Sequence, residues 1–254
     1  MKVRGLVNLI TGGCSVLGLA TARHLVSKGG KVVLLDVNHK AGADSVKELG
    51  SENSHFLPCD VTHESQVNEA YAEANQVFGD IRTYLNCAGI LLHDTIIKEE
   101  GTFDAAIFKR VLDVNLFGSF LCTTMAARHL KKVPIEGKER GLIINSSSIA
   151  ARMASTGYTA YSASKGGIEG MLLPIARELG QHKIRVMNIA PGLMITPMTE
   201  AIPQERKQVI GGLTTRGEFG EAEHFAQLVE AIITNGYLNA TSIHLDDGLV
   251  VPHV

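Results

Sequence analysis

Short apolar runs alternate with longer amphipathic stretches from one end of the chain to the other. The seven runs cover residues 6–10, 31–35, 55–57, 83–87, 142–145, 184–189 and 242–245. Most are nearly continuous in hydrophobicity, which is typical of strands covered on both faces. Stretches that fit helices lie between them, at residues 17–28, 41–49, 64–77, 103–129, 161–179 and 222–234. This alternation predicts an α/β fold: a doubly wound parallel sheet of about seven strands, with helices on both faces.

The sequence is organised as a single domain. Its 254 residues contain no linker rich in proline or serine, no low-complexity tract and no internal repeat. Hydrophobic residues make up 45% of the chain and charged residues 20%, which is enough apolar material for a large core. We expect one domain, 1–254, in which the glycine- and proline-containing segment 193–220 is long enough to cover a substrate.

Charge and composition argue against several other classes of protein. The formal net charge is -2, so the average charge does not favour direct binding of nucleic acid. The four cysteines lie far apart, and this spacing favours free thiols over a disulfide framework: Cys14, Cys59, Cys87 and Cys122. The histidines form no cluster with one another or with cysteine, so we expect no metal site. No apolar run approaches the roughly 20 residues that cross a bilayer, so we expect no membrane span.

A glycine-rich turn follows the first apolar run and precedes the first amphipathic stretch. It reads Thr11-Gly12-Gly13-Cys14-Ser15-Val16-Leu17-Gly18. Glycines at this place let the backbone approach a pyrophosphate, whose charge suits the start of a helix. The turn therefore favours a Rossmann-like, dinucleotide-binding domain.

An acid, Asp36, ends the second apolar run. A carboxylate there can accept a hydrogen bond from a ribose 2′-hydroxyl and would repel a 2′-phosphate, so NAD is favoured over NADP. The simpler interpretation of Asp36 is a solvated acid at a strand end. Asp60 follows the third apolar run. From its spacing alone, we favour the interpretation that Asp60 is a solvated acid at a strand end.

Tyr161 and Lys165 stand four residues apart at the start of an amphipathic stretch, so their side chains share a helix face. A nearby ammonium and a positively charged nicotinamide ring would both lower the pKa of the phenol toward the range of a useful base. Three serines, 146–148, close the fifth run, where an open α/β sheet binds ligands. A hydroxyl there could bond a substrate oxygen, although serines at such a place also serve as caps and turns.

Taken in order, these motifs resemble those of the short-chain dehydrogenase/reductases, and the resemblance runs along nearly the whole chain. The motifs are the turn 11–18, Asn86-Cys87-Ala88-Gly89, Asp113-Val114-Asn115-Leu116, Ser148 thirteen residues before Tyr161, Tyr161-x-x-x-Lys165 and Pro191-Gly192. The resemblance implies an oxidoreductase that moves a hydride between NAD and a secondary alcohol or ketone. The substrate class that it implies is a 3-hydroxyacyl-CoA or a hydroxysteroid.

The resemblance also implies roles for individual residues. Tyr161 would be the general acid/base, with Lys165 lowering its pKa and holding the nicotinamide ribose. Ser148 would orient the substrate oxygen, and Asn115 would support a water relay behind Lys165. The cofactor-binding set would be Gly12, Ser15, Leu17, Gly18, Asp36, Asp60, Val61, Cys87, Ala88, Tyr161, Lys165, Met194 and Thr196. In this set Asp36 would bind the adenosine ribose, and Asp60 and Val61 would flank the adenine. For Asp60, this implied role replaces the simpler interpretation of a solvated acid at a strand end.

The same resemblance implies a homotetramer and a mitochondrial location, with a cytoplasmic location as the alternative. Residues 1–35 carry five basic side chains and no acid. An import receptor could recognise such a stretch, but we favour the simpler interpretation that it is a basic first strand–helix unit.

Three residues depart from the family pattern. Val16 replaces the middle glycine of the turn and could crowd the cofactor. Asn8 lies inside the first apolar run, and Arg82 stands where the family usually has an acid. All four predicted catalytic residues are present, so we expect a functional enzyme with weakened cofactor affinity. The alternative is a catalytically weak or inactive scaffold subunit of a multiprotein assembly, such as one that processes tRNA.

Overall fold

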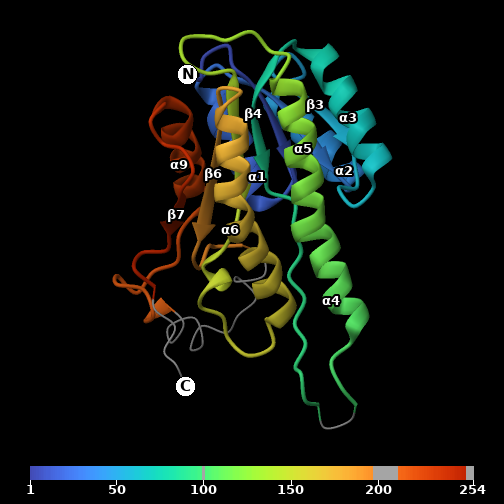
Figure 1. The fold of residues 1–254 in the computed structure, drawn as a ribbon, viewed down its shortest axis with the longest axis vertical. Helices are drawn as coiled ribbons and strands as arrows, with labels where there is room; N and C mark the ends of the chain where they lie inside the picture. The colour runs from blue at the N-terminus through green and yellow to red at the C-terminus, as the bar shows by residue number, and fades with distance from the viewer. Residues whose placement is uncertain (99–100, 197–210, 250–254) are drawn as a thin grey trace.

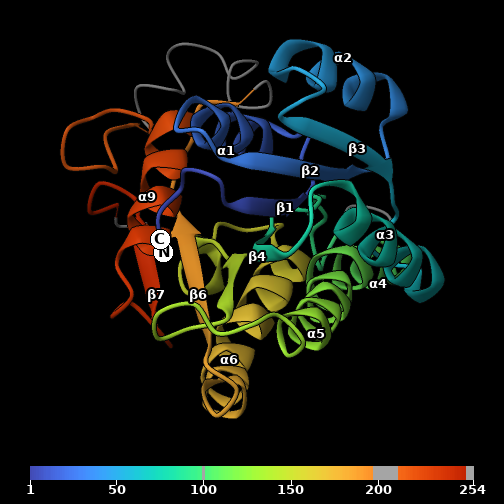
Figure 2. The ribbon, with the colours of Figure 1, turned by 90° about the horizontal axis from the view of Figure 1, so that it is seen from above.

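The computed structural model describes residues 1–98, 101–196 and 211–249. Seven parallel strands form one sheet in the order β3-β2-β1-β4-β5-β6-β7 (Figure 2). The strands are β1 Val7–Thr11, β2 Lys31–Asp36, β3 Ser54–Pro58, β4 Ile81–Asn86, β5 Gly141–Ser146, β6 Ile184–Pro191 and β7 Ser242–Leu245. The prediction of a doubly wound, Rossmann-like parallel sheet is thus confirmed.

Helices cover both faces of this sheet. They are α1 Val16–Ser27, α2 His39–Leu49, α3 Glu64–Val77, α4 Ala105–Leu112, α5 Ser119–Leu130, α6 Thr159–Gly180 and α9 Ala222–Thr234. Helices α1, α2 and α9 lie on one side of the sheet, and α3 to α6 lie on the other (Figure 2). Neighbouring strand residues belong to opposite cores: Leu9 packs in the cluster with α3, α5 and α6, and Ile10 packs in the cluster with α1 and α9. Strands with two buried faces explain why the apolar runs are continuous.

Side-chain caps fix the starts of several helices. The side chain of Ser15 accepts a hydrogen bond from the Gly18 amide (3.3 Å) at the start of α1. Asn38 accepts one from the Ala41 amide (3.0 Å) and so begins α2. Such caps satisfy amides that have no partner within the helix, and they place the helix starts at the carboxyl edge of the sheet.

The stretch 103–129, predicted as one helix, is interrupted. Helix α4 ends at Leu112, a π-helical turn spans Asp113–Gly118, and α5 continues from Ser119. The turn contains Asn115, whose side chain donates to the Ile90 carbonyl (2.9 Å) and accepts from the Ile90 amide (2.8 Å). These tertiary bonds hold Asn115 in place, and π-helical turns often occur at functional sites for this reason.

Helix α4 and the connection from β4 extend beyond the end of the sheet as an arm (Figure 1). Buried Asp94 organises this arm: one carboxylate oxygen accepts from the Asp104 amide (2.9 Å), and the other pairs with Lys98 (2.8 Å). The Asp94 amide donates to the Gly157 carbonyl (3.0 Å) in the loop before α6. The arm is therefore fastened to the segment that leads into Tyr161.

The predicted substrate-covering segment 193–220 lies only partly within the described residues, because 197–210 fall outside them. Its two ends meet next to β6: the Ile195 amide donates to the Gly220 carbonyl (2.7 Å), and the Gly220 amide donates to the Leu193 carbonyl (2.8 Å). The two ends are thus held at the carboxyl edge of the sheet. Within the described residues, no helix is long and apolar enough to cross a membrane.

Two of the three departures from the family pattern are accommodated locally. The Asn8 side-chain amide donates to the carbonyls of Leu6 (3.2 Å) and Lys31 (3.0 Å), so only its oxygen lacks a partner among the described residues. Arg82 donates to the Pro134 carbonyl (3.0 Å) and pairs with Glu136 (3.2 Å). Each side chain therefore has polar partners near the start of its strand.

Candidate active site

Glycines bring the backbone of the turn against its neighbours. Gly12 has a φ of 61°, and a Cβ there would lie 2.8 Å from the Ala88 backbone after β4. A Cβ on Gly18 would collide with the carbonyl oxygen of Gly12. Both positions therefore require glycine so that the strand, the turn and α1 can pack closely.

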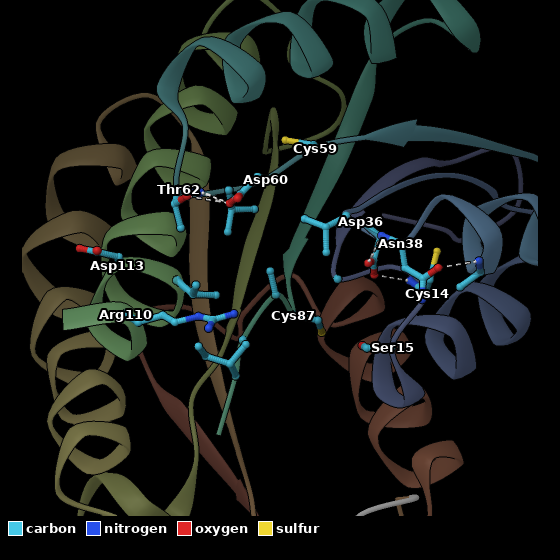
Figure 3. A pocket seen from close by; sticks show the side chains of 18 of the residues that line it. Cys14, Ser15, Asp36, Asn38, Cys59, Asp60, Thr62, Cys87, Arg110 and Asp113 are labelled. Atoms are coloured by element: carbon cyan, nitrogen blue, oxygen red, sulfur yellow. Dashed lines mark hydrogen bonds between the residues drawn. The ribbon is translucent and has the colours of Figure 1, made fainter. Parts of the chain in front are cut away.

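A cavity of about 670 Å³ opens at the carboxyl edge of β1, β2 and β4 (Figure 3). The predicted cofactor residues among those that line it are Gly12, Ser15, Asp36, Asp60, Val61, Cys87 and Ala88. Thr196 lines a second cavity of about 530 Å³ on the other side of the turn, together with Val16 and Ile195. Leu17, Gly18, Met194, Tyr161 and Lys165 are not among the residues that line the first cavity. The structure therefore gathers seven of the predicted cofactor residues around one space.

Asp36 stabilises the turn as well as lining this cavity. One of its carboxylate oxygens accepts from the Cys14 amide (3.1 Å), and the other accepts from the Asn38 amide (3.1 Å). Each oxygen retains a lone pair for a ligand hydroxyl. The carboxylate at this end of the cavity can accept a hydrogen bond from a ligand hydroxyl and would repel a phosphate.

Val16 is the first residue of α1 and is 37% exposed. Its side chain lines the second cavity beside Ser15 and Ile195. Glycine at this position would leave the space between the turn and the Ile195–Thr196 segment open. The valine methyl groups occupy part of that space.

Three of the four predicted catalytic side chains converge after β5. The Ser148 side chain lies close enough to Tyr161 to lower the pKa of its phenol, and the Ser148 oxygen accepts a hydrogen bond from the Ala150 amide (3.1 Å). The Lys165 ammonium donates to the Ser146 carbonyl (2.7 Å) and lies 5.6 Å from the centre of the Tyr161 ring. Tyr161 and Lys165 point to this place because they are one turn apart on α6.

Burial controls the ionisation of this group. Burial lowers the pKa of Lys165 to about 8, because the ammonium is removed from water. Burial also raises the pKa of Tyr161, and the interaction with Ser148 opposes that rise. The Lys165 ammonium lies near the tyrosine ring, and its predicted lowering of the Tyr161 pKa stays a prediction.

Asn115 connects the arm to α6. Besides its two bonds to Ile90, its side-chain amide donates to the Ser164 hydroxyl (3.1 Å), and that hydroxyl donates to the Tyr161 carbonyl (2.7 Å). A Cβ on Gly89 would lie 3.3 Å from the Asn115 oxygen and 3.7 Å from the Lys165 nitrogen. Asn115 therefore positions the helix that carries Tyr161, and its predicted water relay stays a prediction.

Sequence reasoning missed several residues of the site. Asn38, Val114 and Arg110 line the first cavity, and Ser164 links Asn115 to Tyr161. Asn38 had a local signal as a helix cap three residues before Ala41. Arg110 had none, because its place depends on how α4 lies against the sheet.

The amino-acid sequence is similar to those of other proteins along nearly its whole length. The family described as short chain dehydrogenase matches residues 6–207. A 3-hydroxyacyl-CoA dehydrogenase type-2 from Homo sapiens is 44% identical over 98% of this chain and 96% of that protein. Its namesake from Drosophila melanogaster is 37% identical over 97% of this chain and 98% of that protein. A crystal structure of a 3-hydroxyacyl-CoA dehydrogenase type-2 from Mycobacterium avium superposes with a TM-score of 0.92 at 31% identity, over 98% of this chain and 97% of that one.

The family match and these relatives agree with the order of the motifs and with the convergence of Ser148, Tyr161 and Lys165. The prediction of a dehydrogenase enzyme is thereby confirmed, and the chain belongs to the short-chain dehydrogenase family.

Proposed function

We propose that this enzyme uses NAD to interconvert the secondary alcohol and the ketone of a 3-hydroxyacyl-CoA. The observation that carries the proposal is the convergence of Ser148, Tyr161 and Lys165 after β5. The cofactor part rests on the cavity with Asp36 at its edge. The substrate class rests on relatives named 3-hydroxyacyl-CoA dehydrogenase.

The residues around the cavity fit NAD. Glycines at 12 and 18 stand where a Cβ would collide, so the backbone of the turn can lie close to a ligand. The N-terminus of α1, capped by Ser15, suits a pyrophosphate, and Asp36 suits a ribose diol. When bound, NAD supplies a hydride acceptor and a positive ring charge that favours the tyrosinate.

The chain's own residues then handle the proton. The Ser148 hydroxyl holds the substrate oxygen, and the Tyr161 phenolate takes the proton of the alcohol while the carbinol hydrogen leaves as a hydride. The product is a ketone, and Tyr161 is left protonated. Lys165 supplies positive charge beside the Tyr161 ring, 5.6 Å from its centre, which favours the phenolate.

The first test is a fluorescence titration with NADH, with NADPH as the control. Saturable binding of NADH that is weaker or absent for NADPH is expected from Asp36. Turnover is then measured with a 3-hydroxyacyl-CoA and with a hydroxysteroid, and only the acyl-CoA is expected to give high kcat/KM.

Tyr161→Phe separates catalysis from binding. We expect a loss of turnover of roughly 10²–10⁴-fold, the usual contribution of a general acid/base residue, with NADH affinity kept within about threefold. Undiminished turnover in this variant would contradict the mechanism.

We also propose a homotetramer, from the resemblance and from exposed apolar side chains on neighbouring helices. Phe117, in the π-helical turn, and Phe120, at the start of α5, are each 45% exposed, and Leu173 on α6 is 44% exposed. Sedimentation that shows only monomer would contradict this. We also propose a mitochondrial location, from the resemblance and from the acid-free stretch 1–35, which contains β1, α1 and most of β2. Subcellular fractionation tests it.

A further inference from the structure

One arginine reaches into the first cavity without a partner. Arg110 lies on α4, and its guanidinium points into the cavity from the side opposite Asp36 and Cys14 (Figure 3). Within the part of the chain that the structure describes, this guanidinium has no hydrogen bond and no ion pair. An arginine left unpaired at a binding cavity is available to a ligand.

The other charged side chains around the cavity are already engaged. Lys109 pairs with Asp113, whose side chain points away from the cavity in Figure 3. Asp60 accepts from the amide (2.9 Å) and the hydroxyl (2.7 Å) of Thr62. Asp36 accepts from two backbone amides. Arg110 is therefore the cation at this cavity that the described residues leave uncompensated.

The walls near Arg110 favour a flat apolar group over a phosphate. Val114 lies one turn further along the same helical segment, and Val61 lines the cavity with it. Val37, next to Asp36, adds an apolar side chain on the other side of the same cavity and is 65% exposed. The donors suited to a pyrophosphate lie at the other side of the cavity, where α1 begins at Val16.

We propose that the Arg110 guanidinium stacks on the adenine ring of the bound dinucleotide and is a cofactor-positioning residue. This inference rests on the proposed use of NAD. A ribose held by Asp36 carries its base into the part of the cavity lined by Val61, Val114 and Arg110. The planar guanidinium can then cover the face of the ring and close the adenine end of the cavity.

The test is calorimetric binding of ADP-ribose, which carries the adenine but lacks the nicotinamide and needs no turnover. Arg110→Ala is expected to weaken binding about 5- to 20-fold, as loss of a cation–π contact would. Arg110→Met keeps a side chain that can pack on the ring, so it should lie between wild type and Arg110→Ala. Arg177→Ala is the matched control: Arg177 is also exposed on a helix and does not line the cavity, so its affinity should stay within about twofold of wild type.

Three results would overturn the inference. Unchanged affinity in Arg110→Ala would make Arg110 a solvated surface residue. A second result would be wild-type affinity in Arg110→Lys together with an affinity in Arg110→Met as weak as in Arg110→Ala. That result would show that Arg110 binds a phosphate of the ligand and not the adenine ring. Equal weakening by Arg177→Ala would point to a general charge effect. Failure of the wild-type protein to bind either NADH or ADP-ribose would instead remove the proposed cofactor, so the two failures are distinguishable.

Discussion

Single side chains decide how the cofactor turn and the catalytic group behave. Val16 places a branched side chain where the resemblance leads us to expect glycine, and Asp36 holds the backbone of the same turn through the Cys14 amide. Lys165 keeps an ammonium beside Tyr161, although burial disfavours that charge. Two predictions follow from these contacts.

Val16→Gly should tighten NADH binding. Removing the side chain opens the space between the turn and Ile195, and relief of crowding of about 1 kcal/mol corresponds to a roughly fivefold lower Kd. The change should also lower the free energy of unfolding by about 0.5–1 kcal/mol, because glycine is a poor helix former. Val16→Ala controls for the helix effect and should recover part of the affinity. Identical Kd values for all three proteins would show that the Val16 side chain does not hinder binding of the cofactor.

Lys165→Met should change how stability depends on pH. The folded-state pKa of Lys165, about 8, lies below its ordinary value of 10.5, so the wild type bears the full cost of the buried ammonium below pH 8. That cost disappears as the pH rises toward 10.5. The free energy of unfolding of wild type relative to Lys165→Met should therefore rise between pH 8 and pH 10 in urea titrations. A constant difference across this range would contradict the lowered pKa.

At the scale of elements, β6 and α9 are fastened together by one buried arginine. Arg185 is 6% exposed, and its guanidinium pairs with Glu139 (2.5 Å) and donates to the carbonyls of Ile232 (3.0 Å) and Leu238 (2.8 Å). The Ile232 carbonyl lies in the last turn of α9, where carbonyls have no donor within the helix, and the Leu238 carbonyl lies in the segment that follows. The arginine therefore ties the end of that helix to the sheet.

Arg185→Met should lower the free energy of unfolding by about 3–5 kcal/mol, because it leaves Glu139 with the N-terminal ammonium alone (3.2 Å) and removes the donor of the Ile232 and Leu238 carbonyls. The measurement is urea unfolding followed by circular dichroism. Arg23→Met is the matched control, since Arg23 and Glu48 form an exposed pair, and such pairs contribute less than about 1 kcal/mol. Comparable losses in both variants would contradict the role given to Arg185.

The sequence predicts most of the elements because each buried strand carries its own signal. The second apolar run, 31–35, became β2 Lys31–Asp36, and the stretch 64–77 became α3 with the same bounds. The π-helical turn escaped prediction because the pattern around Asn115 continues as in an ordinary amphipathic helix. Its cause is a contact with Ile90, 25 residues away in sequence.

The residues of the candidate site also fall into those that local motifs predict and those that depend on tertiary packing. The resemblance brought Ser148, Tyr161 and Lys165 together in the right order, because the motif spacing is set by local structure. It did not find Arg110, whose direction depends on the packing of α4. The resemblance also did not predict that the pKa of Tyr161 is raised, because this shift arises from burial in the folded protein.

The whole molecule should respond to its cofactor as one unit, because the proposed site draws on β1, β2, β4 and α4 together. NADH at about 100 times its Kd should stabilise the folded state by about 2.7 kcal/mol. For a chain of this size that corresponds to a rise in Tm of about 5–10 °C. Thermal melts with NADPH at the same concentration serve as the control and should show little change. A Tm that NADH leaves unaltered would argue against a dinucleotide site.

The π-helical turn Asp113–Gly118 sets a limit on which length changes the chain can tolerate. Such a turn holds one residue more than an α-helix would use. Deleting one residue there would let α4 run straight into α5 as an ordinary α-helix, and Met125 and Leu130 would keep their buried positions. The deletion would instead move Asn115 away from its hydrogen-bond partners Ile90 and Ser164. Homologous chains that keep this architecture should therefore accept insertions and deletions at the tip of the arm and reject them within these six residues.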